Sequence, residues 1–147
     1  MKKYKLIKSY KKGLYRVKSL IDFNNVKKDD IGGYVEREKN LSHFDDAWVY
    51  DNAKVTGNAE VSGNAGVFGG EDYIVFKNFW TSKRYFTFTF SNKLYKVGCF
   101  LGTGDELIKK AYQDSEISGS EYERVVKYVN SILKDRENEN TNKENKK

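Results

Sequence analysis

Alanine and valine recur with a period of six residues in the middle of the chain. Residues 45–68 read as four consecutive hexads, DDAWVY, DNAKVT, GNAEVS and GNAGVF. Four matches in a row at a fixed period indicate a repeat architecture. The alanines are Ala47, Ala53, Ala59 and Ala65, and the valines that follow two positions later are Val49, Val55, Val61 and Val67.

This spacing predicts a coil of parallel strands. A valine every six residues places one branched apolar side chain on each flat side, pointing inward, and the alanine fits where the coil is narrow. Asn and Gly suit the corners, where a left-handed or open backbone is needed. Three hexads close one triangular turn, and coils of this kind are left-handed, an exception to the usual right-handed crossover. Val35 and Leu41 continue the alanine phase backwards, so we expect the coil to begin near residue 34.

The predicted coil has only about two turns. A stack this short leaves both ends open and buries too little apolar surface to be stable alone. We therefore expect flanking segments, other subunits, or both to cap it.

The flanking segments alternate apolar and polar residues with a loose period of two, which is typical of strands. Phe86, Phe88 and Phe90 fall on one face of their strand, and this leaves the opposite face free for a ligand. Turns are expected at residues 12–13 and 91–93. We expect strands over residues 2–8, 13–23, 72–76, 84–90 and 94–100.

Two helices are predicted after the last strand, over residues 104–113 and 121–135. Each begins with the S/T-x-x-E spacing of a capping box, at Thr103 and at Ser120. The second helix has one apolar stripe. Its members are Tyr122, Val125, Val126, Val129, Ile132 and Leu133.

The sequence as a whole predicts an α+β protein that is mostly β, with a short left-handed parallel β-helix at its centre. N-terminal strands and a C-terminal ββαα module flank the β-helix. The end of the chain is polar and is expected to be disordered. The expected segments are a basic capping segment (1–33), the β-helix (34–70), the hairpin and two-helix module (71–135) and the tail (136–147).

The net charge of +6 is concentrated at the N-terminus, where residues 1–28 carry +9. Residues 29–133 carry −4. A basic arm attracts polyanions such as nucleic acid or an acidic protein, although a solvated lysine-rich surface has the same composition. One Cys and one His exclude an internal disulfide and argue against a metal site. No run is apolar enough to span a membrane, and no apolar run follows the first lysines, so we expect a cytoplasmic protein.

Several of these motifs resemble a family of hexapeptide-repeat proteins common in bacteriophages and prophages. The resemblance is carried by LYRVKSLIDF, VKKDDIGGYVEREKNLS and DAWVYDNAKVTGNAEV, and by GCFLGTGDEL near the end, and it covers residues 13–107. It implies a left-handed β-helix, a trimer as in related folds, and the cytoplasm of a bacterial host. Some members are labelled transferases because their fold is similar to that of hexapeptide acyltransferases, an analogy that does not establish activity.

His43 is the only candidate for catalysis. In hexapeptide acyltransferases a histidine acts as general base, with acyl-CoA bound between neighbouring coils, and this coil is too short for such a groove. We expect no catalytic residue and no cofactor, and a surface or capping role for His43. Cys99 lies within a predicted strand and is expected to be a small buried residue.

Aromatic and cationic side chains mix across the predicted C-terminal hairpin, and such a mixture can stack a base and pair its phosphate. Thr103 lies between two glycines before a helix, where free N–H groups can hold an anion or the Thr can simply cap the helix. The candidate binding residues are Trp80, Lys83, Arg84, Tyr85, Tyr95, Lys96 and Thr103.

These patterns favour a non-catalytic, oligomeric phage accessory protein that binds a host component, with a trimer preferred. It could counter host defence by docking on a protein or by sequestering a small anionic, nucleotide-like signal. The alternatives are a hexapeptide-type acyltransferase, a virion-associated structural protein and a nucleic-acid binder.

Overall fold

The computed structural model describes residues 2–145 and confirms a mixed α+β protein with mostly strands and two helices. Its residues divide into two compact units, 1–103 and 104–147. The first unit holds all the strands, and the second holds the two helices.

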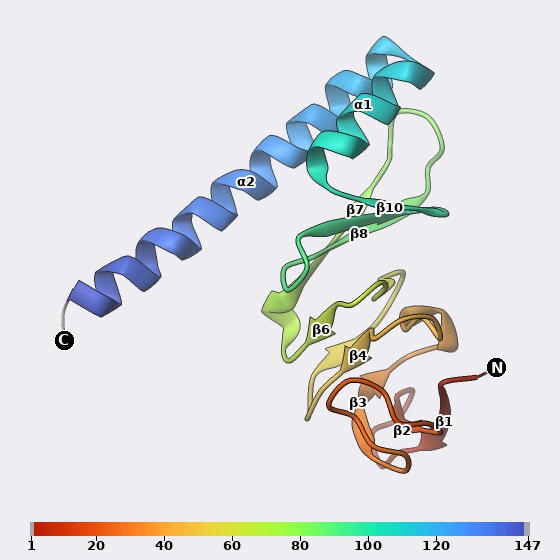
Figure 1. Cartoon of the computed structure of the whole chain (residues 1–147). Coiled ribbons are helices and arrows are strands. Elements are labelled where there is room, and N and C mark those ends of the chain that lie inside the picture. Colours follow the sequence, from red (N-terminus) through yellow and green to blue (C-terminus); the bar gives the residue numbers. More distant parts are fainter. Residues whose placement is uncertain (1, 146–147) are drawn as a thin grey trace. The chain divides into compact units, whose positions relative to one another are not determined.

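Residues 31–67 form two stacked turns whose strands pair in parallel (Figure 1). Each turn has three sides, and each side of the first turn pairs with the matching side of the second. The pairs are β3 (Ile31–Val35) with β5 (Lys54–Val55), Leu41 with Val61, and β4 (Trp48–Val49) with β6 (Gly66–Val67).

The interior of this coil is a stack of branched side chains. One side chain from each side of each turn points inward, and all six are at most 1 % exposed. Burial of a valine side chain contributes about 1.5 kcal/mol or more, so these residues supply much of the stability of the unit. The stacked pairs are Val35 on Val55, Leu41 on Val61, and Val49 on Val67.

The predicted phase of the first turn is wrong. Val35 and Leu41 pair with Val55 and Val61, so they occupy the valine phase and not the alanine phase. The paired residues are 20 positions apart on these two sides and 18 apart between Val49 and Val67. The two additional residues lie between Leu41 and Ala47, and they widen one corner of the first turn.

The N-terminal strands extend one side of the coil into an antiparallel sheet. β1 (Tyr4–Lys8) pairs with β2 (Tyr15–Ser19), and β2 pairs with β3, which gives the order β1-β2-β3-β5. Tyr4 and Val17 are fully buried and belong to the same core as the coil. The coil and its N-terminal strands therefore share one core.

A second antiparallel sheet follows the coil. Its strands are β7 (Tyr73–Lys77), β8 (Tyr85–Thr89), β9 (Leu94–Val97) and β10 (Phe100–Gly102), in the order β10-β9-β8-β7. The expected single strand over 94–100 is divided into β9 and β10, because Gly98 adopts φ = +58° and turns the chain back.

This second sheet joins the second turn of the coil. Thr87 Oγ1 accepts a hydrogen bond from the Glu60 N–H at 2.9 Å, and Ser91 Oγ accepts one from the Gly66 N–H at 2.8 Å. Thr87 and Thr89 are buried, so the face of β8 opposite the phenylalanines is not free, contrary to the prediction. The sheet instead satisfies backbone groups of the coil.

The second unit is a pair of helices, α1 (Gly104–Asp114) and α2 (Glu116–Asn145), that pack on each other. Gly119 is required there, because a Cβ at this position would lie 2.2 Å from the ring of Tyr112.

The disordered tail expected over residues 136–147 differs from the structure, in which α2 continues to Asn145. Its last turns contain Glu, Lys and Arg, which favour helix, and no Pro or Gly to end it. The last two residues of the predicted tail lie outside the described residues. Neither helix, within residues 2–145, is sufficiently long and apolar to cross a membrane.

Candidate functional site

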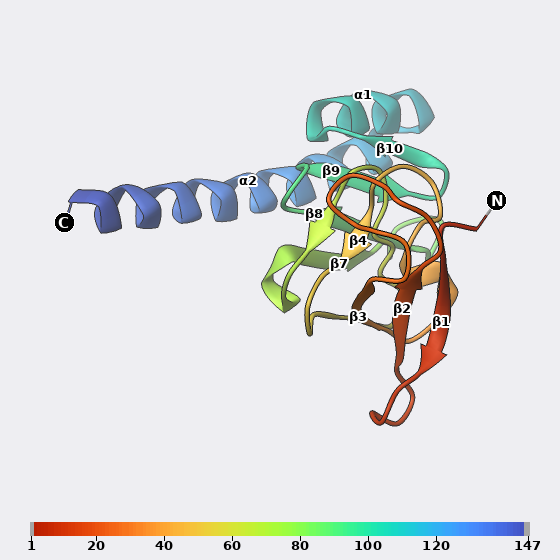
Figure 2. The same cartoon turned by 60° about the horizontal axis from the view of Figure 1, so that its bottom comes forward.

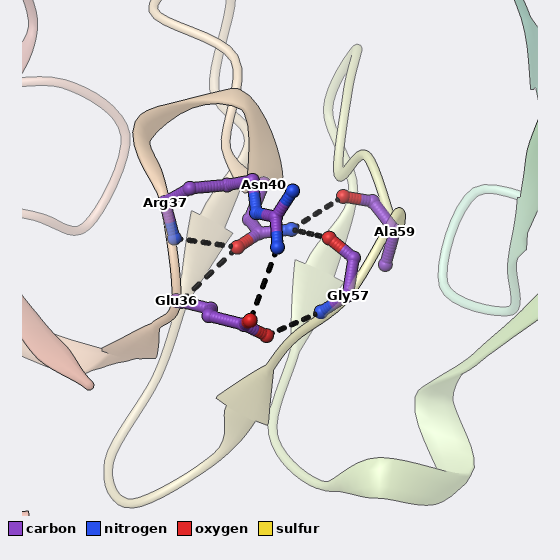
Figure 3. Close-up of polar contacts among 5 residues, drawn as sticks. All are labelled: Glu36, Arg37, Asn40, Gly57 and Ala59. Atoms are coloured by element: carbon purple, nitrogen blue, oxygen red, sulfur yellow. Dashed lines mark hydrogen bonds and ion pairs between the residues drawn. The ribbon is translucent and has the colours of Figure 1, made fainter. Parts of the chain in front are cut away.

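A buried side-chain amide joins two stacked corners, one from each turn of the coil (Figure 3). Asn40 is completely buried, and its Oδ1 accepts the backbone N–H groups of Glu36 at 3.0 Å and Arg37 at 2.9 Å. Its Nδ2 donates to the carbonyls of Gly57 at 3.1 Å and Ala59 at 2.8 Å. All four of these hydrogen bonds join the Asn40 side chain to backbone groups, so Asn40 fixes the spacing of the two corners.

Glu36 adds a second link between the same corners. Its Oε2 accepts the Gly57 N–H at 2.8 Å, and its Oε1 pairs with Arg37 Nη2 at 3.0 Å (Figure 3). The Gly57 N–H and the Arg37 guanidinium hold the pKa of the Glu36 carboxyl below its ordinary value. We call Glu36, Arg37, Asn40, Gly57 and Ala59 the corner clamp.

A cleft of about 540 Å³ opens beside the corner clamp. One wall is formed by the two corners, and the other by the start of β8 and the β9–β10 turn. The lining residues from the corners are Arg37, Lys39, Asn40, Gly57, Asn58, Ala59 and Glu60, and those from the second sheet are Arg84, Tyr85, Gly98 and Cys99.

The lining carries more positive than negative charge. Arg37, Lys39 and Arg84 line the cleft, and Glu60 is the one carboxylate in its lining. Arg37 is paired with Glu36, whereas the Lys39 and Arg84 side chains form no ion pair or hydrogen bond with the residues described in the structure. Two uncompensated cations facing a cleft favour an anionic occupant.

Three of the predicted binding residues lie at this region. Arg84 and Tyr85 line the cleft. Lys96 lines a second hollow of about 560 Å³, which shares Lys39, Glu60 and Cys99 with the first.

The other predicted binding residues lie outside both hollows. Lys83 donates from Nζ to the Phe79 carbonyl at 2.6 Å, and the Trp80 ring packs edge-on against the Phe79 ring. Thr103 is exposed directly before α1.

Tyr95 is 1 % exposed and packs against Phe88, so it cannot meet a ligand at the surface. Its hydroxyl has no hydrogen-bond partner among the described residues, and burial raises its pKa. Tyr95 was a candidate because aromatic and cationic residues mix along the hairpin, and this mixture gives no information on which face the chain covers.

His43 lies in a network that engages both of its ring nitrogens. Nδ1 accepts the Lys3 backbone N–H at 3.1 Å, so Nε2 carries the proton that bonds to Glu38 Oε1 at 2.8 Å. The ring also stacks on Tyr4 at a centroid distance of 4.0 Å. With no free ring nitrogen in this arrangement, His43 holds the N-terminal strand to the widened corner of the coil. No motif in the sequence identified Glu38 as the carboxylate that orients the His43 ring.

Lys3 strengthens the same attachment from inside. The side chain is 2 % exposed, and its Nζ donates to the carbonyls of Ala47 at 2.6 Å and Asp45 at 3.1 Å. Burial lowers the pKa of this ammonium to about 8, although Asp46 and Asp45 oppose the shift. An amine with this pKa remains mostly charged at neutral pH, at a cost in stability.

The expectation that Cys99 is buried is wrong. Cys99 is exposed, because Gly98 turns the chain at this point and places the thiol at the tip of the β9–β10 hairpin. Within residues 2–145 there is no group of three or more His, Cys, Asp or Glu side chains arranged to hold a metal ion.

Sequence reasoning missed Asn40, Arg37 and Lys39. They lie in a segment without hexads, so the repeat gave no signal for them. In the hexads the residue directly before a valine lies in a strand, as Trp48 and Lys54 do, so the repeat would not have indicated a corner at Asn40 even with Leu41 in the valine phase. No family model matches the chain, and a search of curated proteins also finds no match.

Proposed function

We propose that this chain is a non-catalytic binding protein that captures a small anionic, nucleotide-like ligand in the cleft beside the corner clamp. The observation that carries the proposal is the pair of uncompensated cations, Lys39 and Arg84, in one cleft of about 540 Å³. The volume falls within the usual range for small-molecule sites.

The composition of the lining supports a phosphate-bearing ligand with an aromatic group. Arg84 can bind a phosphate through two parallel N–H donors, and Lys39 adds a point charge. Tyr85 is 43 % exposed beside Arg84 and offers a ring on which a base can stack. Glu60 can accept hydrogen bonds from a sugar hydroxyl or an exocyclic amine.

The rigidity of one wall also supports binding. The corner clamp fixes the backbone of residues 36–40 against residues 57–59 through hydrogen bonds that are buried or partly buried. A site that is organised before the ligand arrives loses less entropy on binding.

We further propose that the coil is a left-handed β-helix of the hexapeptide-repeat kind and that the protein is a phage accessory factor acting in the host cytoplasm. The spacing of 18 residues between Val49 and Val67, three hexads, supports the first part. Sequestration of a nucleotide-like signal is a function that needs no catalytic residue. A trimer rests on the resemblance alone, because the N-terminal strands and the second sheet already cover the coil within one chain.

Calorimetry and thermal shift with inorganic pyrophosphate, a mononucleotide and a cyclic dinucleotide test the proposal. Charge-assisted hydrogen bonds contribute about 1.5–3 kcal/mol each, so the Lys39→Gln/Arg84→Gln double variant is expected to weaken binding about 100-fold or more. The control is Lys109→Gln/Lys127→Gln, which removes the same charge from exposed positions of the helices.

Native mass spectrometry of the purified protein complements these measurements, because a retained signal would appear as added mass. If none of the three probes binds at millimolar concentration and no added mass is found, the capture function is wrong. Equal loss in both double variants would show that the cleft is not the site.

A further inference from the structure

A second group of cations and tyrosines, none of which lines the cleft, lies around the β1–β2 hairpin. Its members come from the hairpin turn, from β2 and β3, and from the start of β5. We call Tyr10, Lys11, Arg16, Tyr34 and Lys54 the hairpin cluster. Figure 2 shows the turn that joins β1 and β2 projecting beyond the ends of the strands.

Two cations share one buried ring in this cluster. Arg16 Cζ lies 4.5 Å and Lys11 Nζ 4.9 Å from the centroid of Tyr34, whose side chain is 1 % exposed. Arg16 is held in place, since its Nε donates to the Gly32 carbonyl at 3.0 Å and its Nη2 to the Asp51 carbonyl at 2.7 Å. These partners are neutral carbonyls, so the guanidinium charge stays uncompensated.

A third cation, Lys54, lies near the second. The neighbouring Lys11 amine lowers the pKa of Lys54. Like charges repel, and a bound anion would weaken that repulsion. In the part of the chain that the structure describes, Lys11, Arg16 and Lys54 have no carboxylate partner.

One of the two tyrosines of the cluster is presented to solvent. Tyr10 is 86 % exposed at the hairpin turn, whereas Tyr34 is 1 % exposed. A projecting tyrosine cannot enclose a small molecule, which needs a concave site. An open surface of cations with an exposed ring suits a flexible strand, whose phosphates meet the cations while a base stacks on the ring.

We propose that the hairpin cluster is a docking surface for single-stranded nucleic acid, with Lys11 and Lys54 on the phosphates and Tyr10 stacked on a base. The charge of the surrounding segment supports this assignment, because residues 1–28 carry +9 and would steer a polyanion to the hairpin. The surface is separate from the cleft and would act whether or not the cleft holds a ligand.

Fluorescence anisotropy with labelled 20-nucleotide DNA and RNA strands at 20–200 mM salt tests the proposal. We expect Lys11→Gln/Lys54→Gln to weaken binding at least 10-fold and to make the slope of log K against log salt shallower by about 1.4, since each single-strand phosphate contact contributes about 0.7. Lys11→Arg/Lys54→Arg should retain binding. Tyr10→Ala should weaken binding about 5-fold or more and Tyr10→Phe should not, because stacking needs the ring alone.

Two controls separate this surface from general charge and from the cleft. Lys109→Gln/Lys127→Gln removes the same charge elsewhere, and Lys39→Gln/Arg84→Gln removes it from the cleft; both should bind strands within twofold of the original protein. The proposal is overturned if no strand binds at 20 mM salt, if all three double variants lose affinity equally, or if duplex DNA binds as tightly as single strands.

Discussion

The corner clamp makes a specific prediction about stability through Asn40. Asn40→Ala removes four hydrogen bonds. Among the residues that the structure describes, the Arg37 N–H and the Gly57 and Ala59 carbonyls lose their partner, whereas the Glu36 N–H keeps the Val55 carbonyl at 3.2 Å. At about 1 kcal/mol for each bond, the free energy of unfolding should fall by about 4 kcal/mol. Proteins of this kind are stable by about 5–15 kcal/mol, so the variant should remain folded, with a Tm lower by roughly 10 °C.

Two further variants test the cause of this loss. Asn58→Ala changes an exposed asparagine of the hexads and should alter stability by no more than about 0.5 kcal/mol. Asn40→Asp keeps the acceptor for Glu36 and Arg37 but turns an oxygen toward two carbonyls. Since those carbonyls raise the pKa of the new carboxyl in the folded state, its stability relative to the original protein should be greatest at acid pH and fall as the pH rises through that pKa.

Urea unfolding followed by circular dichroism measures all three variants at pH 4, 5.5 and 7. The m-value should stay constant, which would show that the surface exposed on unfolding is unchanged. A loss below about 1 kcal/mol for Asn40→Ala, equal to that for Asn58→Ala, would refute the reasoning and show that the strand pairs alone hold the corners.

Three other predictions follow from buried and turned residues. Burial lowers the pKa of Lys3 to about 8, so the unfolded chain binds one more proton than the folded chain between about pH 8 and 10. The unfolding free energy should therefore rise with pH in this range by up to about 1.4 kcal/mol per pH unit. Urea titrations of Lys3→Met should lack this rise. Gly33→Ala should cost about 1–3 kcal/mol in the same assay, because its Cβ would lie 2.6 Å from the Ala53 carbonyl, whereas Gly70→Ala, with open space around it, should be near neutral. A thiol reagent should modify Cys99 in the folded protein without denaturant, and protection until denaturant is added would contradict its exposed position.

The parts of the fold that a periodic pattern specifies were predictable. The hexads place Val49, Val55, Val61 and Val67 inside the coil, and the structure buries all four. The second helix was predictable for the same reason, since its apolar stripe repeats at helical spacing. Periodicity identifies which side of an element is apolar, and these elements have one apolar side.

The parts that depend on what covers an element were not predictable. Val35 and Leu41 were placed in the wrong phase because a two-residue insertion is invisible when the flanking segment has no hexads. Thr87 was expected to face outward, but the coil covers it and uses its hydroxyl. In the candidate site, Arg84 and Tyr85 could be identified from the mixture of aromatic and cationic residues. Lys39 could not, because it lines the same cleft only after segments far apart in the sequence have paired.

The widened corner between Leu41 and Ala47 shows that the pairing of the stacked strands does not depend on the length of the loop between them. Leu41 on one side and Trp48 on the other keep their parallel partners although two residues have been added between them. Lengthening a flexible loop costs little, about 0.6 kcal/mol for each doubling. A peptide grafted after Phe44, whose side chain already faces solvent, could therefore be displayed from this scaffold while the valine stack stays in register.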